Sequence, residues 1–261
     1  MSTDRGILDR PGPQPARTES YGPAPHQVYE VHEPSTAPRA WVVLVHGGFW
    51  RAVWDRTHLR PLAAALASEG YAVALVEFAR SGMVGGGPPG TFDDVTAALA
   101  AVRREEAGAL PVVLVGHSAG GHLAVWLLHQ PAAAPVPGYG PVVGAVSLAG
   151  CLDLTTVADL GLDDGAAHDL MGGTPADLPE AYSLADPARL GPTPSPVVVV
   201  HGTTDDRVPV AVAESWWSAA ATPGRDRLLL PEGADHFAMI DPASTAYPLL
   251  TGELARLLAR T

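Results

Sequence analysis

The strongest constraint on the fold is a regular alternation of short apolar runs with segments of helical character. Residues 40–45 read Ala-Trp-Val-Val-Leu-Val, a continuous apolar run that is typical of a strand buried on both faces of a sheet. Strand-like patterns recur at 27–32, 71–76, 111–115, 142–148, 196–200 and 227–230. Helical patterns separate them, at 59–68, 92–104, 119–129, 210–221 and 247–259. This order predicts right-handed crossovers and an α/β fold with a doubly wound, mostly parallel sheet and helices on both faces.

The length of the chain and the composition of its loops predict one domain with two additions. A chain of 261 residues can bury a sizeable core, and α/β chains of this size usually form a single domain, here residues 26–261. Residues 1–25 are rich in Pro, Gly and charge, which predicts a loose N-terminal segment and leaves room for one strand before Trp41. Residues 153–194 are too long for an ordinary connection, so we expect a small, partly helical cap between the sixth and seventh strands of the fold.

Composition excludes several classes of protein. The chain is 47% hydrophobic and 17% charged, which is typical of a globular protein and not of a disordered one. Its formal net charge is −12 and it has no Lys/Arg cluster, so we expect neither nucleic acid nor membrane as a partner. Cys151 is the only cysteine, which excludes an intramolecular disulfide. With no secretory signal pattern and no apolar run of roughly 20 residues, the expected location is cytoplasmic.

One pentapeptide points to nucleophilic catalysis. Gly116-His117-Ser118-Ala119-Gly120 fits the pattern Gly-x-Ser-x-Gly, directly after the apolar run at 111–115 and at the start of a helical pattern. In that context the pattern is typical of a nucleophile elbow, a tight turn that lifts a serine hydroxyl above the end of a sheet. A serine that merely caps a helix explains the pentapeptide alone equally well. The strand before it and the helix after it favour Ser118 as a nucleophile.

A second motif, His46-Gly47-Gly48-Phe49-Trp50, follows the apolar run at 40–45. Attack on a carbonyl group creates an oxyanion, which preorganised backbone N–H groups stabilise. A loop of this type supplies such donors together with the residue after the nucleophile. The predicted oxyanion hole consists of the N–H groups of Gly48, Phe49 and Ala119. Trp50 and His46 are predicted to contact the substrate, although aromatic residues beside a site belong to the core at least as often.

The base and the acid are expected on two loops near the end of the chain. A nucleophile elbow is followed along the chain first by a carboxylate and then by a histidine. The run at 196–200 leads to Asp205 and Asp206, and the last predicted strand is followed by His236. A neighbouring imidazole must take the proton of the serine, and a carboxylate must hold that imidazole in the right tautomer. We therefore predict His236 as the base and Asp205 as the acid.

Two other aspartates remain alternatives for the acid. Asp206 is adjacent to Asp205, but the following Arg207-Val208-Pro209 indicates that its side chain turns toward solvent or a local partner. Asp153 follows another predicted strand, where its simpler role is to cap a helix.

The remaining histidines do not indicate a metal site. His122 and His129 are seven positions apart on one predicted helix, but they lack the carboxylate or thiolate neighbours that usually complete such a site. No His-Glu-x-x-His pattern occurs. His46 and His117 belong to the two motifs, and His201 is most simply a hydrogen-bonded residue at the end of a strand. We expect neither a metal nor an organic cofactor.

These motifs resemble those of α/β-hydrolases, which implies the α/β-hydrolase fold. The stretch 201–206 looks like the acid loop of the prolyl-oligopeptidase and esterase branches, and this implies that the first aspartate, Asp205, belongs to the triad. A narrower similarity, to the kynurenine formamidase (arylformamidase) group, rests on residues 46–50, 116–123, 153–154 and 235–237. Arg207-Val208-Pro209 departs from that group, because it is the commoner version in esterases and peptidases. The glycine-rich stretch 81–90 has no counterpart in it.

The expected function is hydrolysis of a small-molecule ester or activated amide through an acyl-enzyme on Ser118, for example an aryl formamide such as N-formylkynurenine. The alternative enzyme is a general carboxylesterase or an acyl-peptide hydrolase. A catalytically idle binding protein with the same fold is the alternative from another class. The joint presence of nucleophile, base, acid and oxyanion loop argues against that last interpretation. The sequence leaves the oligomeric state open.

Overall fold

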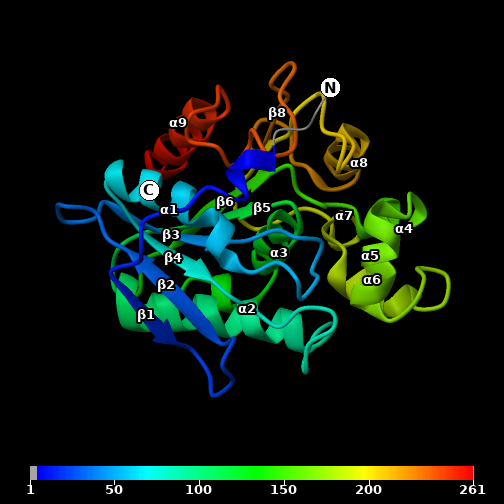
Figure 1. The fold of residues 1–261 in the computed structure, drawn as a ribbon, viewed down its shortest axis with the longest axis horizontal. Coiled ribbons are helices and arrows are strands. Elements are labelled where there is room, and N and C mark those ends of the chain that lie inside the picture. Colours follow the sequence, from blue (N-terminus) through cyan, green and yellow to red (C-terminus); the bar gives the residue numbers. More distant parts are fainter. Residues whose placement is uncertain (1–4, 261) are drawn as a thin grey trace.

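A computed structural model describes residues 5–260 (Figure 1). Its centre is one eight-stranded sheet with the strand order β1-β2-β4-β3-β5-β6-β7-β8. The strands are β1 (Arg17–Ser20), β2 (Val28–His32), β3 (Ala40–Val45), β4 (Tyr71–Val76), β5 (Val112–His117), β6 (Val142–Leu148), β7 (Val197–Val200) and β8 (Arg227–Leu229). Strand β2 runs antiparallel to β1 and β4, and the other neighbouring strands are parallel. The predicted mostly parallel α/β sheet is confirmed.

Helices cover both faces of this sheet, as predicted. They are α1 (Arg60–Ser68), α2 (Gly90–Ala101), α3 (Ala119–Leu127), α4 (Leu154–Asp159), α5 (Leu162–Met171), α6 (Pro179–Ala185), α7 (Pro187–Leu190), α8 (Val210–Ala220) and α9 (Tyr247–Leu258). Short turns of 3₁₀ or π helix complete the set: η1 (Arg5–Ile7), η2 (Arg56–Leu59), η3 (Val102–Ala107) and η4 (Pro131–Ala133). No helix in residues 5–260 combines the length and the apolar character that a membrane span requires.

The pleat of the strands divides the core into two layers. Along β3, Val43 and Val45 pack in one apolar cluster with side chains of α2, α3 and α8. Val42 and Leu44 point to the opposite face and pack with α1 and α9. All six residues of β3 are buried, because a central parallel strand has helices on both sides. This burial explains why a continuous apolar run marks the strand in the sequence.

Part of the N-terminal segment that we expected to be loose is a strand, so the prediction for 1–25 needs correction. Residues Arg17–Ser20 form β1, which pairs antiparallel with β2 at the edge of the sheet. Two strands rather than one therefore precede Trp41. The pattern of β1 is half-exposed and polar, as suits an edge strand, and such a strand lacks an apolar signal. Ile7 is also buried in the core. Residues 1–4 of the predicted loose segment lie outside the described residues.

The segment 153–194 forms a helical insertion between the sixth and seventh strands, β6 and β7. It contains α4 to α7, which cluster on one side of the molecule (Figure 1). Its role as a cap over the site stays a prediction.

The register of the sheet brings the motif loops together. Val45, the last residue of β3, lies opposite Gly116 of β5, so the loop from His46 begins beside the turn that contains Ser118. Strands β7 and β8 run parallel to β5 and β6. Because parallel strands end at the same edge, the loops after β3, β5, β7 and β8 meet there.

Candidate active site

Ser118 occupies a strained turn between β5 and α3. Its φ of 55° and ψ of −120° lie in a region that non-glycine residues seldom adopt. Two glycines make the turn possible: a Cβ on Gly116 would lie 2.0 Å from the carbonyl oxygen of Gly120, and one on Gly120 would lie 2.1 Å from that of Val45. The Ser118 N–H donates to the Leu148 carbonyl at 2.8 Å. This is the geometry of a nucleophile elbow.

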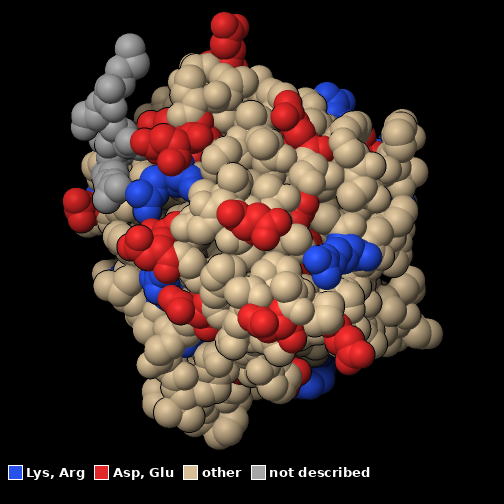
Figure 2. All heavy atoms as spheres, turned by 90° about the vertical axis from the view of Figure 1, so that its right-hand side faces the viewer, with Lys and Arg blue, Asp and Glu red and all other residues tan. Residues whose placement is uncertain are grey.

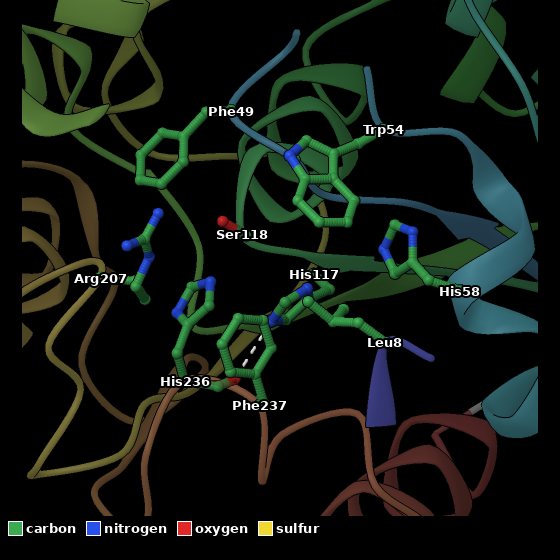
Figure 3. A pocket seen from close by; sticks show the side chains of 10 residues that line it. Leu8, Phe49, Trp54, His58, His117, Ser118, Arg207, His236 and Phe237 are labelled. Atoms are coloured by element: carbon green, nitrogen blue, oxygen red, sulfur yellow. Dashed lines mark hydrogen bonds between the residues drawn. The ribbon is translucent and has the colours of Figure 1, made fainter. Parts of the chain in front are cut away.

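Ser118 opens onto a cavity of about 50 Å³ (Figure 3). The lining residues are Leu8, Gly48, Phe49, Trp54, His58, His117, Ser118, Arg207, His236 and Phe237. Figure 3 shows the Ser118 hydroxyl between the side chains of Phe49, Trp54 and His236. The cavity therefore brings the predicted nucleophile and the predicted base into one space.

Asp205 is the carboxylate that contacts His236. His236 Nδ1 donates to Asp205 Oδ2 at 2.7 Å. The other carboxylate oxygen, Oδ1, accepts the backbone N–H groups of Arg207 at 2.9 Å and Val208 at 2.8 Å. Burial by itself raises the pKa of Asp205, but the hydrogen bonds from His201, His236 and the backbone outweigh it and hold that pKa below its usual range. Asp205 is thus a carboxylate anion beside the imidazole.

The two alternative aspartates lie elsewhere. Asp206 is exposed, whereas Asp205 is buried. Asp153 is the N-cap of α4, where its carboxylate accepts the Thr156 N–H at 2.8 Å and the Ser215 hydroxyl at 2.5 Å. Capping therefore accounts for Asp153.

The glycine loop after β3 lies against the nucleophile. A Cβ on Gly47 would lie 2.9 Å from the Cβ of Ser118, so only glycine fits there. Gly48 and Phe49, with φ values of 107° and 48°, line the same cavity as Ser118. Within residues 5–260, the N–H groups of Gly48, Phe49 and Ala119 have no hydrogen-bond acceptor. The three predicted oxyanion donors therefore make no hydrogen bond within the described part of the chain.

Comparison with known protein families identifies the relatives of the chain. The family model BD-FAE matches residues 28–219, which include the two glycine motifs and Asp205. The chain belongs to the BD-FAE family. No curated protein sequence matches it.

Three solved structures that are similar to this BD-FAE member are described as esterases. A truncated carbohydrate esterase from gut microbiota aligns with a TM-score of 0.76 and 17% identity, over 96% of this chain and 100% of that one. Esterase Est2 of the Planctomycetes species Thermogutta terrifontis aligns with a TM-score of 0.68 and 19% identity, over 97% and 96%. Esterase B of Lactobacillus rhamnosis aligns with a TM-score of 0.73 and 17% identity, over 98% and 90%. These likenesses confirm the α/β-hydrolase fold. Neither the family nor these structures carries the kynurenine formamidase description, so the narrower resemblance is unconfirmed.

Two residues predicted to contact substrate do not reach the cavity in this BD-FAE member. Trp50 and His46 are both 0% exposed and neither is among the described residues that line the cavity. The Trp50 ring packs edge-on against His122, with 5.3 Å between ring centroids. His46 stacks on Phe78 at 4.5 Å. The prediction for these two residues is corrected: both side chains turn into the core under the loop.

The buried His46 side chain holds the glycine loop after β3 in place through a hydrogen bond to its backbone. Its Nδ1 donates to the Gly47 carbonyl oxygen at 2.7 Å, and its Nε2 lies 3.0 Å from Glu77 Oε1. In a trans peptide the carbonyl and the following N–H point in opposite directions. A Gly47 carbonyl held toward His46 therefore turns the N–H of Gly48 away from it. The buried carboxylate of Glu77 holds this arrangement together.

Glu77 is charged although it is buried. Burial raises its pKa, but His46, Arg80 and the backbone N–H of Arg56 lower it by more. The net effect is a fall of the pKa from an ordinary 4.5 to about 2. The Arg80 and Arg56 guanidinium groups lie 2.7 Å and 3.2 Å from its oxygens. A carboxylate whose pKa is lowered in the folded protein stabilises the fold at every pH at which it is ionised.

Replacement of Glu77 by Gln is therefore expected to lower the free energy of unfolding by roughly 2–3 kcal/mol at pH 6. The folded pKa is depressed, so the contribution is present above the ordinary pKa of 4.5 and is lost as the pH falls toward 2. The difference between wild type and Glu77→Gln should shrink from pH 6 to pH 3. Urea unfolding of both proteins at pH 6, 4 and 3 measures it, and a difference that does not vary with pH would contradict the prediction.

Several cavity residues were not assigned a site role from the sequence. Trp54, Arg207 and Phe237 lie within four positions of Trp50, Asp205 and His236, so nearness to the motifs was an available signal. Leu8 had no such signal, because it reaches the cavity from the far N-terminus.

The buried histidines around the site make local hydrogen bonds. His117 Nε2 donates to the carbonyl oxygen of His236 at 3.1 Å, and burial together with the nearby His236 ring places the pKa of His117 well below its usual value. His201 Nε2 donates to the Val208 carbonyl at 2.8 Å and lies 3.3 Å from Asp205 Oδ2. His122 Nε2 donates to the Ala185 carbonyl at 2.8 Å. Within residues 5–260 no group of three or more His, Cys, Asp or Glu side chains is arranged so that it could hold a metal ion.

Proposed function

We propose that this chain is a serine hydrolase of the carboxylesterase type, which cleaves small esters through an acyl-enzyme. Ser118 is the nucleophile, His236 the general base and Asp205 the acid that orients it. The observation that carries the proposal is the joint geometry of the site. One cavity is lined by Ser118 and His236, and His236 donates to the buried carboxylate of Asp205 at 2.7 Å.

The proposed reaction has two halves. Ser118 Oγ attacks the ester carbonyl while His236 Nε2 accepts its proton, and the N–H groups of Gly48, Phe49 and Ala119 stabilise the oxyanion. The ester C–O bond breaks, and the alcohol leaves with the proton from His236. Water then attacks the acyl-enzyme with His236 again as base, which releases the acid and restores Ser118.

The ligands bound in similar solved structures support an ester substrate with a small acyl group. Est2 of Thermogutta terrifontis was solved with propionate and with butyrate bound. Esterase B of Lactobacillus rhamnosis was solved with a tributyrin phosphonate inhibitor. In the proposed enzyme, a small acyl group suits a cavity of about 50 Å³.

The proposal is tested with a fluorophosphonate probe and a panel of p-nitrophenyl esters. We expect the probe to label the protein at Ser118, as mass spectrometry of the labelled peptide would report, and p-nitrophenyl acetate to be hydrolysed. A folded protein that neither takes up the probe nor hydrolyses any ester from acetyl to octanoyl would be better described as an idle binding protein.

Acyl-chain length should reveal the size of the site. Each methylene that fits an apolar pocket is worth about 1–3 kcal/mol, so kcat/KM is expected to rise from acetyl to butyryl. Octanoyl exceeds the small cavity, and kcat/KM should fall again by roughly tenfold or more. Steady-state kinetics along one p-nitrophenyl series measures this. A kcat/KM for octanoyl equal to that for butyryl would contradict a small acyl site.

Cleavage of an aryl formamide such as N-formylkynurenine is a second candidate. The small cavity beside Ser118 favours it, because formyl is the smallest acyl group. A formamidase should lose kcat/KM steadily from formyl onward and should turn over the formamide. Ester hydrolysis that peaks at butyryl, with no formamide turnover, would leave the general carboxylesterase.

A further inference from the structure

One wall of the cavity carries a guanidinium group that the proposed reaction does not use. Arg207 is the only Arg among the described residues that line the cavity, and the chain has no Lys. Figure 3 shows its guanidinium between Phe49 and His236, on the opposite side of Ser118 from Trp54. The guanidinium carbon lies 5.9 Å from the centroid of the Phe49 ring. A cation is thus fixed on one side of the nucleophile.

Most of the hydrogen-bonding capacity of Arg207 is unused. A guanidinium has five N–H donors in a planar fork. Nη2 of Arg207 donates to Asp163 Oδ1 at 3.1 Å, and within residues 5–260 the side chain makes no other hydrogen bond. Its side chain is 31% exposed, so the remaining donors are accessible to a ligand that enters the cavity.

Asp163, the hydrogen-bond partner of the Arg207 side chain, also accepts a hydrogen bond from Arg51. Arg51 Nε donates to the other oxygen of Asp163 at 2.8 Å, and Arg51 also binds Asp169 at 2.8 Å. The carboxylate of Asp163 is therefore divided between two guanidinium groups. Asp163 holds one edge of the Arg207 guanidinium group and leaves the other N–H donors of that group without a counter-ion among the described residues.

The negative charge of the whole molecule makes the Arg207 cation important for the binding of anionic ligands. The net charge is −12, and acidic side chains outnumber basic ones on the face over the helices α4 to α6 (Figure 2). Such a field disfavours anionic ligands in general. A local guanidinium in the cavity therefore decides whether an anionic substrate can bind there.

Resting on the proposed hydrolase function, we propose that Arg207 binds a carboxylate of the substrate. The preferred substrates are then small esters that carry a carboxylate a few bonds from the scissile ester group. A guanidinium fork matches a carboxylate in shape and charge, and charge-assisted hydrogen bonds of this kind are the stronger ones. The carboxylate lies on the Phe49 side of Ser118, and the uncharged part of the substrate lies toward Trp54 and Phe237.

Two matched esters test this assignment: 4-acetoxybenzoate and its methyl ester. They share the acetyl group and the phenolic leaving oxygen, and they differ in the negative charge. We expect Arg207→Gln to lower kcat/KM for 4-acetoxybenzoate by roughly 10- to 100-fold, mainly through KM, while kcat/KM for the methyl ester stays within about threefold. Because the ratio of the two esters is compared between enzyme forms, their intrinsic reactivities cancel.

Three further measurements sharpen the test. Arg207→Lys keeps the charge without the fork and should retain part of the preference. Arg104→Gln removes one positive charge from an exposed position outside the cavity and should leave the ratio unchanged. Raising NaCl from 50 to 500 mM should lower the charged-to-neutral ratio for wild type more than for Arg207→Gln.

The outcomes separate the two proposals. If wild type hydrolyses the methyl ester but Arg207→Gln leaves the ratio unchanged, the carboxylate assignment is overturned and the hydrolase function stands. If a folded wild-type protein hydrolyses neither ester nor any other in the p-nitrophenyl series, both proposals fail. Normal hydrolysis of the methyl ester by Arg207→Gln shows that this variant is folded, so a selective loss on 4-acetoxybenzoate supports the assignment.

Discussion

Replacement of Ser118 by Ala is expected to lower kcat for ester hydrolysis by roughly 10⁵- to 10⁶-fold and to abolish fluorophosphonate labelling. The hydroxyl is the group that the proposed mechanism acylates, and no other serine or threonine lines the cavity in the described part of the chain. Alanine occupies the strained backbone with φ of 55° as well as serine does, so Tm should change little. Steady-state kinetics and thermal unfolding of the same preparation check both statements.

Ser147 provides the matched control. It lies on β6, which pairs with the strand β5 that precedes Ser118, and it is as buried as Ser118 but lies outside the cavity. Its hydroxyl has no hydrogen-bond partner within residues 5–260, so Ser147→Ala removes a buried hydroxyl without breaking a described hydrogen bond. That variant should keep both labelling and turnover. Substantial activity in Ser118→Ala, or an equal loss in Ser147→Ala, would withdraw the assignment of the nucleophile.

Replacement of Asp205 by Asn is expected to lower kcat by about 10⁴-fold, and the structure shows why. Asp205 Oδ1 accepts two backbone N–H groups, so an asparagine at this position would place its carbonyl oxygen there. Its NH₂ group would then face His236 Nδ1, which would have to become an acceptor. The proton of the neutral imidazole would move to Nε2, on the side of Ser118, where it prevents acceptance of the serine proton.

Asp206→Asn is the control for this prediction. The substitution is chemically the same, but Asp206 is exposed whereas Asp205 is buried. We expect it to change kcat by less than about threefold, as an exposed side chain outside the cavity should. Measurement of kcat for wild type, Asp205→Asn and Asp206→Asn across a range of pH completes the comparison. The reverse ranking would transfer the role of the acid to Asp206, and a comparable loss in Asp153→Asn alone would point to the end of β6.

Much of the sheet could be predicted because burial leaves a direct trace in the sequence. The predicted runs at 40–45, 71–76 and 142–148 coincide with β3, β4 and β6, whose residues are all buried. Strand β1 was not predicted. Its residues Arg-Thr-Glu-Ser are polar and half-exposed, and they form a strand only because β2 offers an unpaired edge. An edge strand held by backbone pairing has no pattern that distinguishes it from a polar loop.

The proximity of Ser118, Asp205 and His236 could be predicted because each follows a parallel strand, β5, β7 or β8, and parallel strands end at one edge of the sheet. The sequence also showed which residues neighbour these positions in the chain. It did not show which way each neighbour faces. Trp50 turns into the core, whereas Trp54, four positions later, lines the cavity.

The walls of the cavity were decided by packing between distant segments. Leu8 reaches the site from the N-terminus, and Arg207 is held there by Asp163 of the helical insertion. Neither contact follows from periodicity or motif spacing, because loop side chains take the direction that packing against other segments leaves open. The chain order of the motifs is therefore enough to propose the reaction, whereas the proposed substrate class depends on contacts that form only when the folded segments meet.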